Sequence, residues 1–315
     1  MRYLRQIIIA LLAIVLVSIF ATYKIDFSND FILLNRLQRL CTIILVSITI
    51  AYSTIVFQTI SSNKILTPSL MGYEHLYVFS QVIMLIILGS ESDIFRSKSW
   101  GFIFAVILMV VYSFLLYIFL FRNKKRNVYF ILLIGLVLGI FFNTSTQFLQ
   151  MTIDPNEYGY IQGAVFASLN RTSTDTLLMS FGITFLVFIY LFRSFKYLNI
   201  LSLGRETSFS LGVNYDKIAR KQLLGISVLV AVSTALIGPI TFVGVFISNI
   251  SYKLSRSSAH KETIGLAIGI TLILLLVAQF SIEHFLNYRH SLSVLINLIG
   301  GGYFILLIIK SLKSK

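Results

Sequence analysis

The feature that most constrains this chain is a series of apolar runs that recur along its whole length. A helix that crosses the hydrocarbon layer of a membrane needs about 20 apolar residues. Runs of this kind predict spans at 6–23, 40–60, 72–90, 101–121, 128–150, 177–194, 222–238, 263–283 and 291–309. We therefore expect an all-α polytopic membrane protein, built as one transmembrane domain over residues 1–315, with lipid as its main solvent.

Two shorter apolar stretches complete the predicted topology. Residues 242–252 follow a Gly238-Pro239 break and predict a shorter tenth helix, whereas 160–169 predicts a re-entrant or interfacial segment. Neighbouring helices must shield such short stretches, because lipid offers no partners to free backbone groups. The first run has signal-peptide character but lacks a convincing cleavage site, so we expect an uncleaved first span. About ten helices place both termini on one side.

The placement of charge supports this topology. Apolar residues make up 57% of the chain and charged residues only 12%, against about 25% charged in soluble domains. The net charge of +14 could suggest nucleic acid, but Lys and Arg gather in short clusters between the apolar runs. With the N-terminus inside, 19 of the 26 Lys and Arg residues fall on the inner side. This bias predicts a multi-pass cell-membrane protein with cytoplasmic termini and argues against nucleic-acid binding.

The sequence offers no constellation for catalysis. It holds no HExxH pair and no GxxxxGK[ST] phosphate loop, and its single cysteine, Cys41, excludes an intrachain disulfide. The four histidines are scattered over loops: His75, His260, His284 and His290. Glu283, His284, Arg289 and His290 share one outer loop, where an interfacial cluster is favoured over a weak metal or anion contact. We expect no enzyme activity, no metal site and no cofactor bound by this chain.

Ionisable residues are almost absent from the predicted spans. Ion-coupled transporters keep such groups at membrane depth, and the nearest candidates, Glu74 and Glu283, are expected at span ends. This disfavours a secondary transporter or channel that works alone, and an intramembrane enzyme would need a buried catalytic pair that is missing. Polar residues within spans could line a water-accessible path or bond between helices: Gln58, Asn143, Thr144, Gln147 and Gln150.

The longest polar inner connection runs from Arg193 to Gln222. Within it, two glycines bracket a short segment, residues 203–213, in which Phe209 and Leu211 stand among polar residues. A short helix at the cytoplasmic surface, shaped to fit a groove on a partner, would explain this pattern. On these residues alone, an ordinary solvated loop is the favoured alternative.

Several segments, taken in order, resemble the FecCD type of permease, which serves ABC importers of ferric siderophores, haem and vitamin B12. Arg36-Leu37-Gln38-Arg39 resembles the family's R-x-P-R, and residues 58–72 resemble its Q…NPL…P..LG segment. Residues 160–163 are similar to W-x-x-G-S, and 203–213 to L-G-E-x-A-x-x-L-G-V. Residues 238–244 match G-x-I-x-F-V-G closely. The matches span most of the chain.

The resemblance implies a type II ABC importer permease fold, with a second permease subunit, two cytoplasmic ATPase subunits that bind ATP and Mg²⁺, and an extracytoplasmic substrate-binding protein. Ferric siderophore is the favoured substrate. Arg36 and Arg39 would meet acidic residues of the binding protein. The coupling segment, about 195–221, would dock into the ATPase through Gly204, Arg205, Glu206, Leu211 and Gly212. Gate or hinge roles would fall to Gly238, Pro239, Gly244, Gly300, Gly301 and Gly302.

The sequence also departs from the family pattern. Gln38 replaces a proline, Ser248-Asn249 stands for Pro-His, Ser291 and Gly302 replace prolines, and Arg289 is the nearest substitute for an outer arginine. These losses suggest that the subunit pairs with a different, more typical permease, although pairing with itself remains the alternative.

Overall fold

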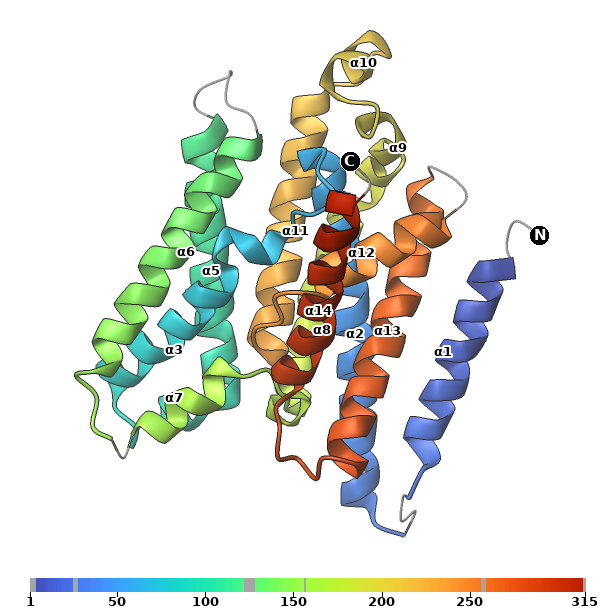
Figure 1. Cartoon of the computed structure of the whole chain (residues 1–315). Helices are drawn as coiled ribbons and strands as arrows, with labels where there is room; N and C mark the ends of the chain where they lie inside the picture. Colours follow the sequence, from blue (N-terminus) through green and yellow to red (C-terminus); the bar gives the residue numbers. More distant parts are fainter. Residues whose placement is uncertain (1–3, 25–27, 122–127, 156, 256–258, 314–315) are drawn as a thin grey trace.

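The computed structural model describes residues 4–24, 28–121, 128–155, 157–255 and 259–313, and the regular elements in these ranges are all helices (Figure 1). The elements are α1 (Leu4–Thr22), α2 (Asp30–Ser61), η1 (Pro68–Met71), α3 (Tyr73–Leu88), α4 (Asp93–Arg96), α5 (Lys98–Phe121), α6 (Val128–Gln150), α7 (Tyr158–Val165), η2 (Leu169–Arg171), α8 (Thr174–Phe195), α9 (Leu198–Leu201), α10 (Arg205–Ser210), α11 (Tyr215–Ile237), α12 (Val243–Leu254), α13 (His260–His284) and α14 (Leu292–Lys313).

The predicted spans correspond to helices. Among the described residues, seven helices are long and apolar enough to cross a membrane: α1, α2, α5, α6, α8, α11 and α13. Helices α3 and α14 match two further predicted spans, α12 is the shorter tenth helix, and α7 occupies the short stretch near 160. The basic residues at 122–126, which contributed to the predicted orientation, lie outside the described residues.

Helix α2 begins ten residues before the predicted span. Asn29 caps it, with its side-chain oxygen accepting hydrogen bonds from the backbone N–H groups of Phe31 and Ile32 at 3.1 and 3.4 Å. Hydropathy missed this first part because Arg36, Gln38 and Arg39 interrupt the apolar run without interrupting the helix. The extension carries both arginines on a helical surface.

Helices α2 and α11 form the centre of the bundle (Figure 1). Helix α2 packs against α13 and α11, and α11 packs in turn against α8 and α5. Helix α1 lies at the periphery, where it contacts mainly α13 and leaves most of its apolar surface exposed. The starts of α1 and α11, the end of α14, and α9 and α10 share one end of the bundle, which we call the α10 end.

Hydrogen bonds between side chains connect the central helices. Tyr52 on α2 donates to Gln222 on α11 at 2.8 Å, and Gln222 donates to Ser194 on α8 at 3.0 Å. Gln58 donates to Ser248 on α12 at 2.9 Å. Gln58 thus bonds between helices, which the sequence had left open, and such contacts fix how helices pack in a membrane.

Two connections that contain no α-helix, which we call the non-helical segments, run into the bundle; the first includes the 3₁₀ turn η1. Residues 62–72 separate α2 from α3, and residues 238–242 separate α11 from α12. Tyr112 on α5 donates its hydroxyl to the carbonyl of Met71 at 2.7 Å, which anchors the first segment. The second begins at Gly238, whose φ of +95° requires a glycine. Helix α3 therefore starts within the bundle and not at its end (Figure 1).

The position of Glu74 corrects the expectation that it lies at the end of a span. Glu74 is in the first turn of α3 and is only 9% exposed, because α3 starts inside the bundle. Thr241, in the second non-helical segment, donates its hydroxyl to the Glu74 carboxylate at 2.5 Å. The chain thus carries a buried ionisable group that hydropathy placed at the surface.

Helix α6 reaches the first non-helical segment through a Gly135-x-x-x-Gly139 pair, the small-residue spacing that lets backbones approach closely in membranes. A Cβ at Gly135 would lie 2.9 Å from the Met71 Cα, and one at Gly139 would lie 3.0 Å from the Gly72 Cα. Backbone atoms cannot rotate away from an added Cβ. Glycine at these two positions therefore lets α6 pack this closely against η1. The spacing is visible in the sequence, but the partner that it approaches is not.

We expect Gly135→Ala to destabilise the protein by about 1 to 3 kcal/mol, the usual range for overpacking a filled interior. The matched control is Gly182→Ala on α8, where nothing lies within 4 Å of the added Cβ. There the higher helix propensity of alanine should leave stability unchanged or raise it by less than about 1 kcal/mol. Thermal unfolding of the purified variants measures both, and equal melting temperatures would contradict the close approach.

Candidate functional site

The predicted coupling segment folds into two short helices, α9 and α10, before the chain enters α11. Gly212 adopts a φ of +74°, which a residue with a side chain rarely takes. The buried Ser208 hydroxyl hydrogen-bonds to the carbonyls of Ile200 and Gly204 at 3.0 and 2.7 Å, and Arg205 pairs with Asp216 at 2.8 Å. These contacts give the segment a defined shape, unlike the solvated loop that was the alternative.

The outer surface of this segment is partly apolar. Leu203, Phe209 and Leu211 are 57%, 45% and 56% exposed, and Glu206 is also exposed. The segment stands beyond the long helices at the α10 end (Figure 1). Exposed apolar side chains among charged residues are typical of a surface that another protein covers.

A hydrogen-bonded clasp joins the segment to the helical bundle. Asn199 on α9 accepts a hydrogen bond from the backbone N–H of His260 at 2.9 Å and pairs with its Nδ1 at 2.8 Å. The His260 Nε2 pairs with the Thr59 hydroxyl near the end of α2 at 2.8 Å. Nearby, Tyr215 donates to the carbonyl of Ile60 at 2.9 Å. In the sequence His260 is only one of the scattered histidines, since its partners are far away in the chain.

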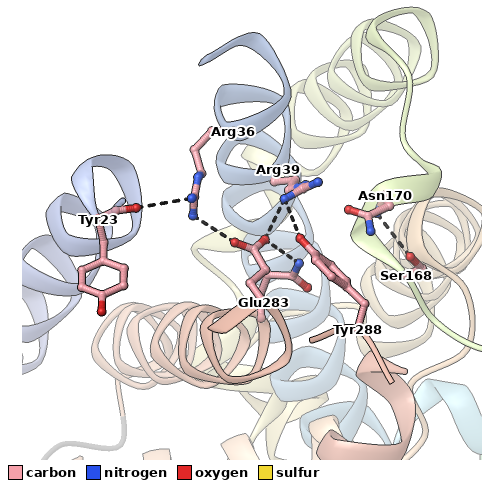
Figure 2. A network of polar contacts seen from close by, with 8 residues as sticks. Tyr23, Arg36, Arg39, Ser168, Asn170, Glu283 and Tyr288 are labelled. Atoms are coloured by element: carbon pink, nitrogen blue, oxygen red, sulfur yellow. Dashed lines mark hydrogen bonds and ion pairs between the residues drawn. The ribbon is translucent and has the colours of Figure 1, made fainter. Parts of the chain in front are cut away.

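At the opposite end of the bundle, Arg36 and Arg39 both pair with Glu283 (Figure 2). Arg36 donates to one carboxylate oxygen of Glu283 at 2.9 Å, and Arg39 donates to the other at 2.8 Å. Gln279 also donates to Glu283 at 2.8 Å, and Arg39 donates to the Tyr288 hydroxyl at 3.1 Å. We call these residues the arginine cluster; with one acid between two guanidinium groups, it keeps a net positive charge.

The remaining candidates near the end of α13 and before α14 are not gathered around a common point. The His284 ring packs between Tyr23 and Phe280, with centroid distances of 4.9 and 4.6 Å. In the described part of the chain, no three His, Cys, Asp or Glu side chains are arranged to hold a metal ion. Burial and the neighbouring Glu283 carboxylate raise the pKa of Tyr288, so its hydroxyl stays protonated at neutral pH.

Hollows flank α7 at this same end of the bundle. One, of about 600 Å³, is lined by Arg96, Lys98 and Arg171 together with aromatic rings such as Tyr77 and Tyr160. Another, of about 540 Å³, has Arg289 and His290 in its wall. Arg171 donates to the carbonyls of Gly163 and Phe166 and to the Tyr77 hydroxyl, which fixes α7 and η2 against α3.

Four of the six predicted gate residues lie in or beside the second non-helical segment: Gly238, Pro239, Gly244 and Gly300. A Cβ on Gly238 would lie 3.0 Å from the Ala167 Cα, and one on Gly244 would lie 2.7 Å from Thr67. A Cβ on Gly300 would lie 2.8 Å from the Phe242 Cβ, whereas nothing lies within 4 Å of one on Gly301 or Gly302. All three glycines lie within the continuous helix α14. Gly300 is therefore a packing contact, and a gate role for the glycines stays a prediction.

Helix α6 exposes polar side chains on its outer surface. Asn143, Thr144 and Gln147 are exposed in the single chain, and Gln150 is half-buried. An exposed amide is unfavourable against lipid. This part of α6 therefore needs either a water-filled space or another protein chain beside it.

Comparison with known proteins agrees with these features. The sequence profile of the FecCD transport family matches residues 5–310. The petrobactin import system permease protein YclO of Bacillus subtilis is 40% identical over 304 residues, which is 96% of each chain. The petrobactin import system permease protein YclN of the same organism is 23% identical over 280 residues, covering 88% of this chain and 85% of YclN.

The fold also matches a solved structure. A chain from an inward-facing metal-chelate type ABC transporter superposes with a TM-score of 0.81 over 97% of this chain and 98% of that one, at 22% identity. The superposition covers 97% of the chain, and the family profile covers residues 5–310. The chain belongs to the FecCD transport family, and it is a membrane-spanning permease of the ABC importer type.

Proposed function

We propose that this chain is the permease subunit of an ATP-driven importer for a ferric siderophore, with the iron complex of petrobactin as the first candidate substrate. The observation that carries this proposal is the family match over residues 5–310, together with the similarity to YclO over 96% of each chain. Within the chain, the shaped segment at the α10 end supplies a surface for a separate ATPase, and the arginine cluster supplies positive charge at the other end.

The α9–α10 segment is proposed to receive the movement of the ATPase. Leu203, Phe209 and Leu211 would enter a groove on that subunit, and Glu206 and Gly212 would lie at its rim. When the ATPase moves α9 and α10, the hydrogen bonds of His260 would move α2 and α13 with them, because Asn199 and Thr59 both bond to the same imidazole. Rigid-body movement of helices is a common way to transmit such a switch. ATP and Mg²⁺ would be bound by the partner.

The arginine cluster is proposed as a docking point for a substrate-binding protein. Arg36 and Arg39 are 11% and 24% exposed at their side chains and already share Glu283. The excess positive charge of the cluster would attract an acidic surface and fix its orientation, which is what interfacial charges contribute most.

A second permease is proposed as the partner of α6. The exposed amides of Asn143 and Gln147 need cover within the membrane. YclO and YclN are both permease proteins of a petrobactin import system in one organism, and this chain is much more similar to YclO. Pairing with a YclN-like chain is therefore favoured over pairing with itself, and co-purification of a tagged copy with only itself would contradict this.

The orientation of the chain is also a proposal, with the α10 end and both termini in the cytoplasm. A reporter fused after Arg126, between α5 and α6, should read as cytoplasmic, whereas one fused after Ser92, before α4, should read as external. A fused green fluorescent protein fluoresces on the cytoplasmic side, whereas a fused alkaline phosphatase is active on the external side. The inverse pattern at both sites would overturn the topology.

Uptake of radioactive iron tests the function directly. A strain that lacks this chain should fail to take up iron loaded on petrobactin and should recover uptake when the chain is restored. Iron supplied with an unrelated siderophore controls for general iron transport. Inactivating the associated ATPase should abolish the restored uptake. Uptake that survives loss of this chain, or inactivation of the ATPase, would reject the proposed role.

A further inference from the structure

The two non-helical segments meet at a small, partly open cavity with buried polar atoms in its wall. It has a volume of about 20 Å³, which is enough for about one water molecule or one small ion. Its polar lining comes from α2, η1, α3 and α11: Ser53, Thr54, Ser69, Glu74, Ser233 and Thr234. Four elements from distant parts of the sequence thus present oxygen atoms to one space, between α2 and α11 at the centre of the bundle.

Two of these oxygen atoms have no partner among the described residues. The Glu74 Oε1 and the Ser53 Oγ are buried and make no hydrogen bond there, and their residues are 9% and 1% exposed. The other Glu74 oxygen accepts from Thr241, and the backbone N–H of Ile240 and the Ser69 hydroxyl also lie against the carboxylate. Buried polar groups are nearly always satisfied, and a buried carboxylate without a compensating charge is costly, above all in a membrane protein. The cavity therefore calls for an occupant.

The chemistry of the lining defines the kind of occupant. The polar side chains around the cavity are hydroxyls and one carboxylate, and neither Lys nor Arg is among the described residues that line it. Hard oxygen ligands of this kind suit alkali and alkaline-earth cations. One carboxylate neutralises one positive charge, so a divalent ion would leave an uncompensated charge in the interior. The small volume favours a dehydrated ion near the size of sodium.

We propose that this cavity binds one dehydrated sodium ion, with the Glu74 Oε1 and the Ser53 Oγ as ligands and the neighbouring hydroxyls completing the shell. The ion would hold α3, which carries Glu74, to α2, which carries Ser53. Through the Thr241 bond to Glu74, it would also fix the segment that precedes α12. The site stands apart from the coupling segment and from the arginine cluster, so it can be tested whether or not the import function holds.

The test compares sodium chloride with choline chloride at equal ionic strength, using the purified full-length chain. Choline cannot enter a cavity of about 20 Å³. A bound ligand stabilises the folded state by mass action, so a tenfold excess of sodium over its dissociation constant should raise the melting temperature by about 3 °C. The rise should saturate with concentration, and equilibrium dialysis with radioactive sodium should show one ion per chain.

Glu74→Gln keeps the shape and the Thr241 contact but removes the charge, so it should abolish both sodium binding and the melting shift. Ser53→Ala removes one ligand with little change to the surrounding packing. It should weaken sodium binding about tenfold, because the lost contact is about as strong as one hydrogen bond. Glu91→Gln, at an exposed carboxylate, is the matched control and should bind sodium normally. Three results would overturn the proposal: equal melting in sodium and choline, sodium binding that survives Glu74→Gln, or an infrared carboxylic-acid band assigned to Glu74 in sodium, which would show a proton in its place.

Discussion

Replacing Glu283 with alanine is expected to cost about 3 to 5 kcal/mol, because the change removes the acid between two guanidinium groups that are largely buried. The Glu283 side chain is 4% exposed, and those of Arg36 and Arg39 are 11% and 24% exposed. Without the carboxylate, two positive charges would face each other with little water to screen them. The apparent melting temperature of the purified protein should fall by about 6 to 15 °C.

The matched control is Glu91→Ala, which breaks the Arg96–Glu91 pair near the same end of the bundle. Its side chains are 51% and 84% exposed, and exposed pairs contribute about 0 to 1 kcal/mol. Adding Arg39→Gln to Glu283→Ala should recover part of the loss, because it removes one of the two repelling charges. If both alanine variants melted alike, the arginine cluster would not be a buried ion pair.

The architecture could be predicted from hydropathy because a membrane span is a local property of the sequence. A run of about 20 apolar residues has few alternatives to a helix that crosses lipid. The predicted runs accordingly match α1, α3, α5, α6, α8, α13 and α14 to within a few residues. The start of α2 was missed because capping by Asn29, and not hydropathy, determines where that helix begins.

The contacts at the candidate sites could not be predicted, since each depends on residues that are far apart in the chain. Arg36 and Glu283 are 247 positions apart, and Asn199 and His260 are 61 apart. Composition and spacing indicated the types of residue but not their partners. The depth of Glu74 was also missed, because an apolar run beginning near residue 72 does not reveal that its helix starts inside the bundle. That depth depends on tertiary packing, because residues 62–72 are held by Tyr112 on α5, by the glycines of α6 and by the contact of Thr67 with Gly244.

Introducing glutamate at both Phe209 and Leu211 is expected to reduce iron uptake at least tenfold while leaving the amount of chain in the membrane unchanged. Both side chains are about half exposed, and the hydrogen bonds and the ion pair that shape the segment come from Ser208 and Arg205. Phe209 adds only a ring contact with the Arg205 guanidinium, 5.9 Å from the ring centroid. The bundle should therefore fold normally. A buried apolar anchor in a protein interface contributes about 2 kcal/mol or more, which corresponds to about 30-fold in affinity. Two charges in a groove of the ATPase should weaken its binding by more than that.

Uptake, membrane level by immunoblot, and co-purification of the ATPase with a tagged chain separate the possible causes. Leu211→Met keeps the apolar surface and should retain uptake and the ATPase. If the double variant lost uptake but still bound the ATPase, the surface would transmit movement without providing affinity. Normal uptake would show that the ATPase does not contact α10.

A variant of His260 separates docking of the ATPase from transmission of its movement. His260→Ala leaves Leu211 exposed but removes the imidazole that links Asn199 to Thr59. That variant should keep the ATPase bound yet transport poorly, because docking and transmission depend on different residues.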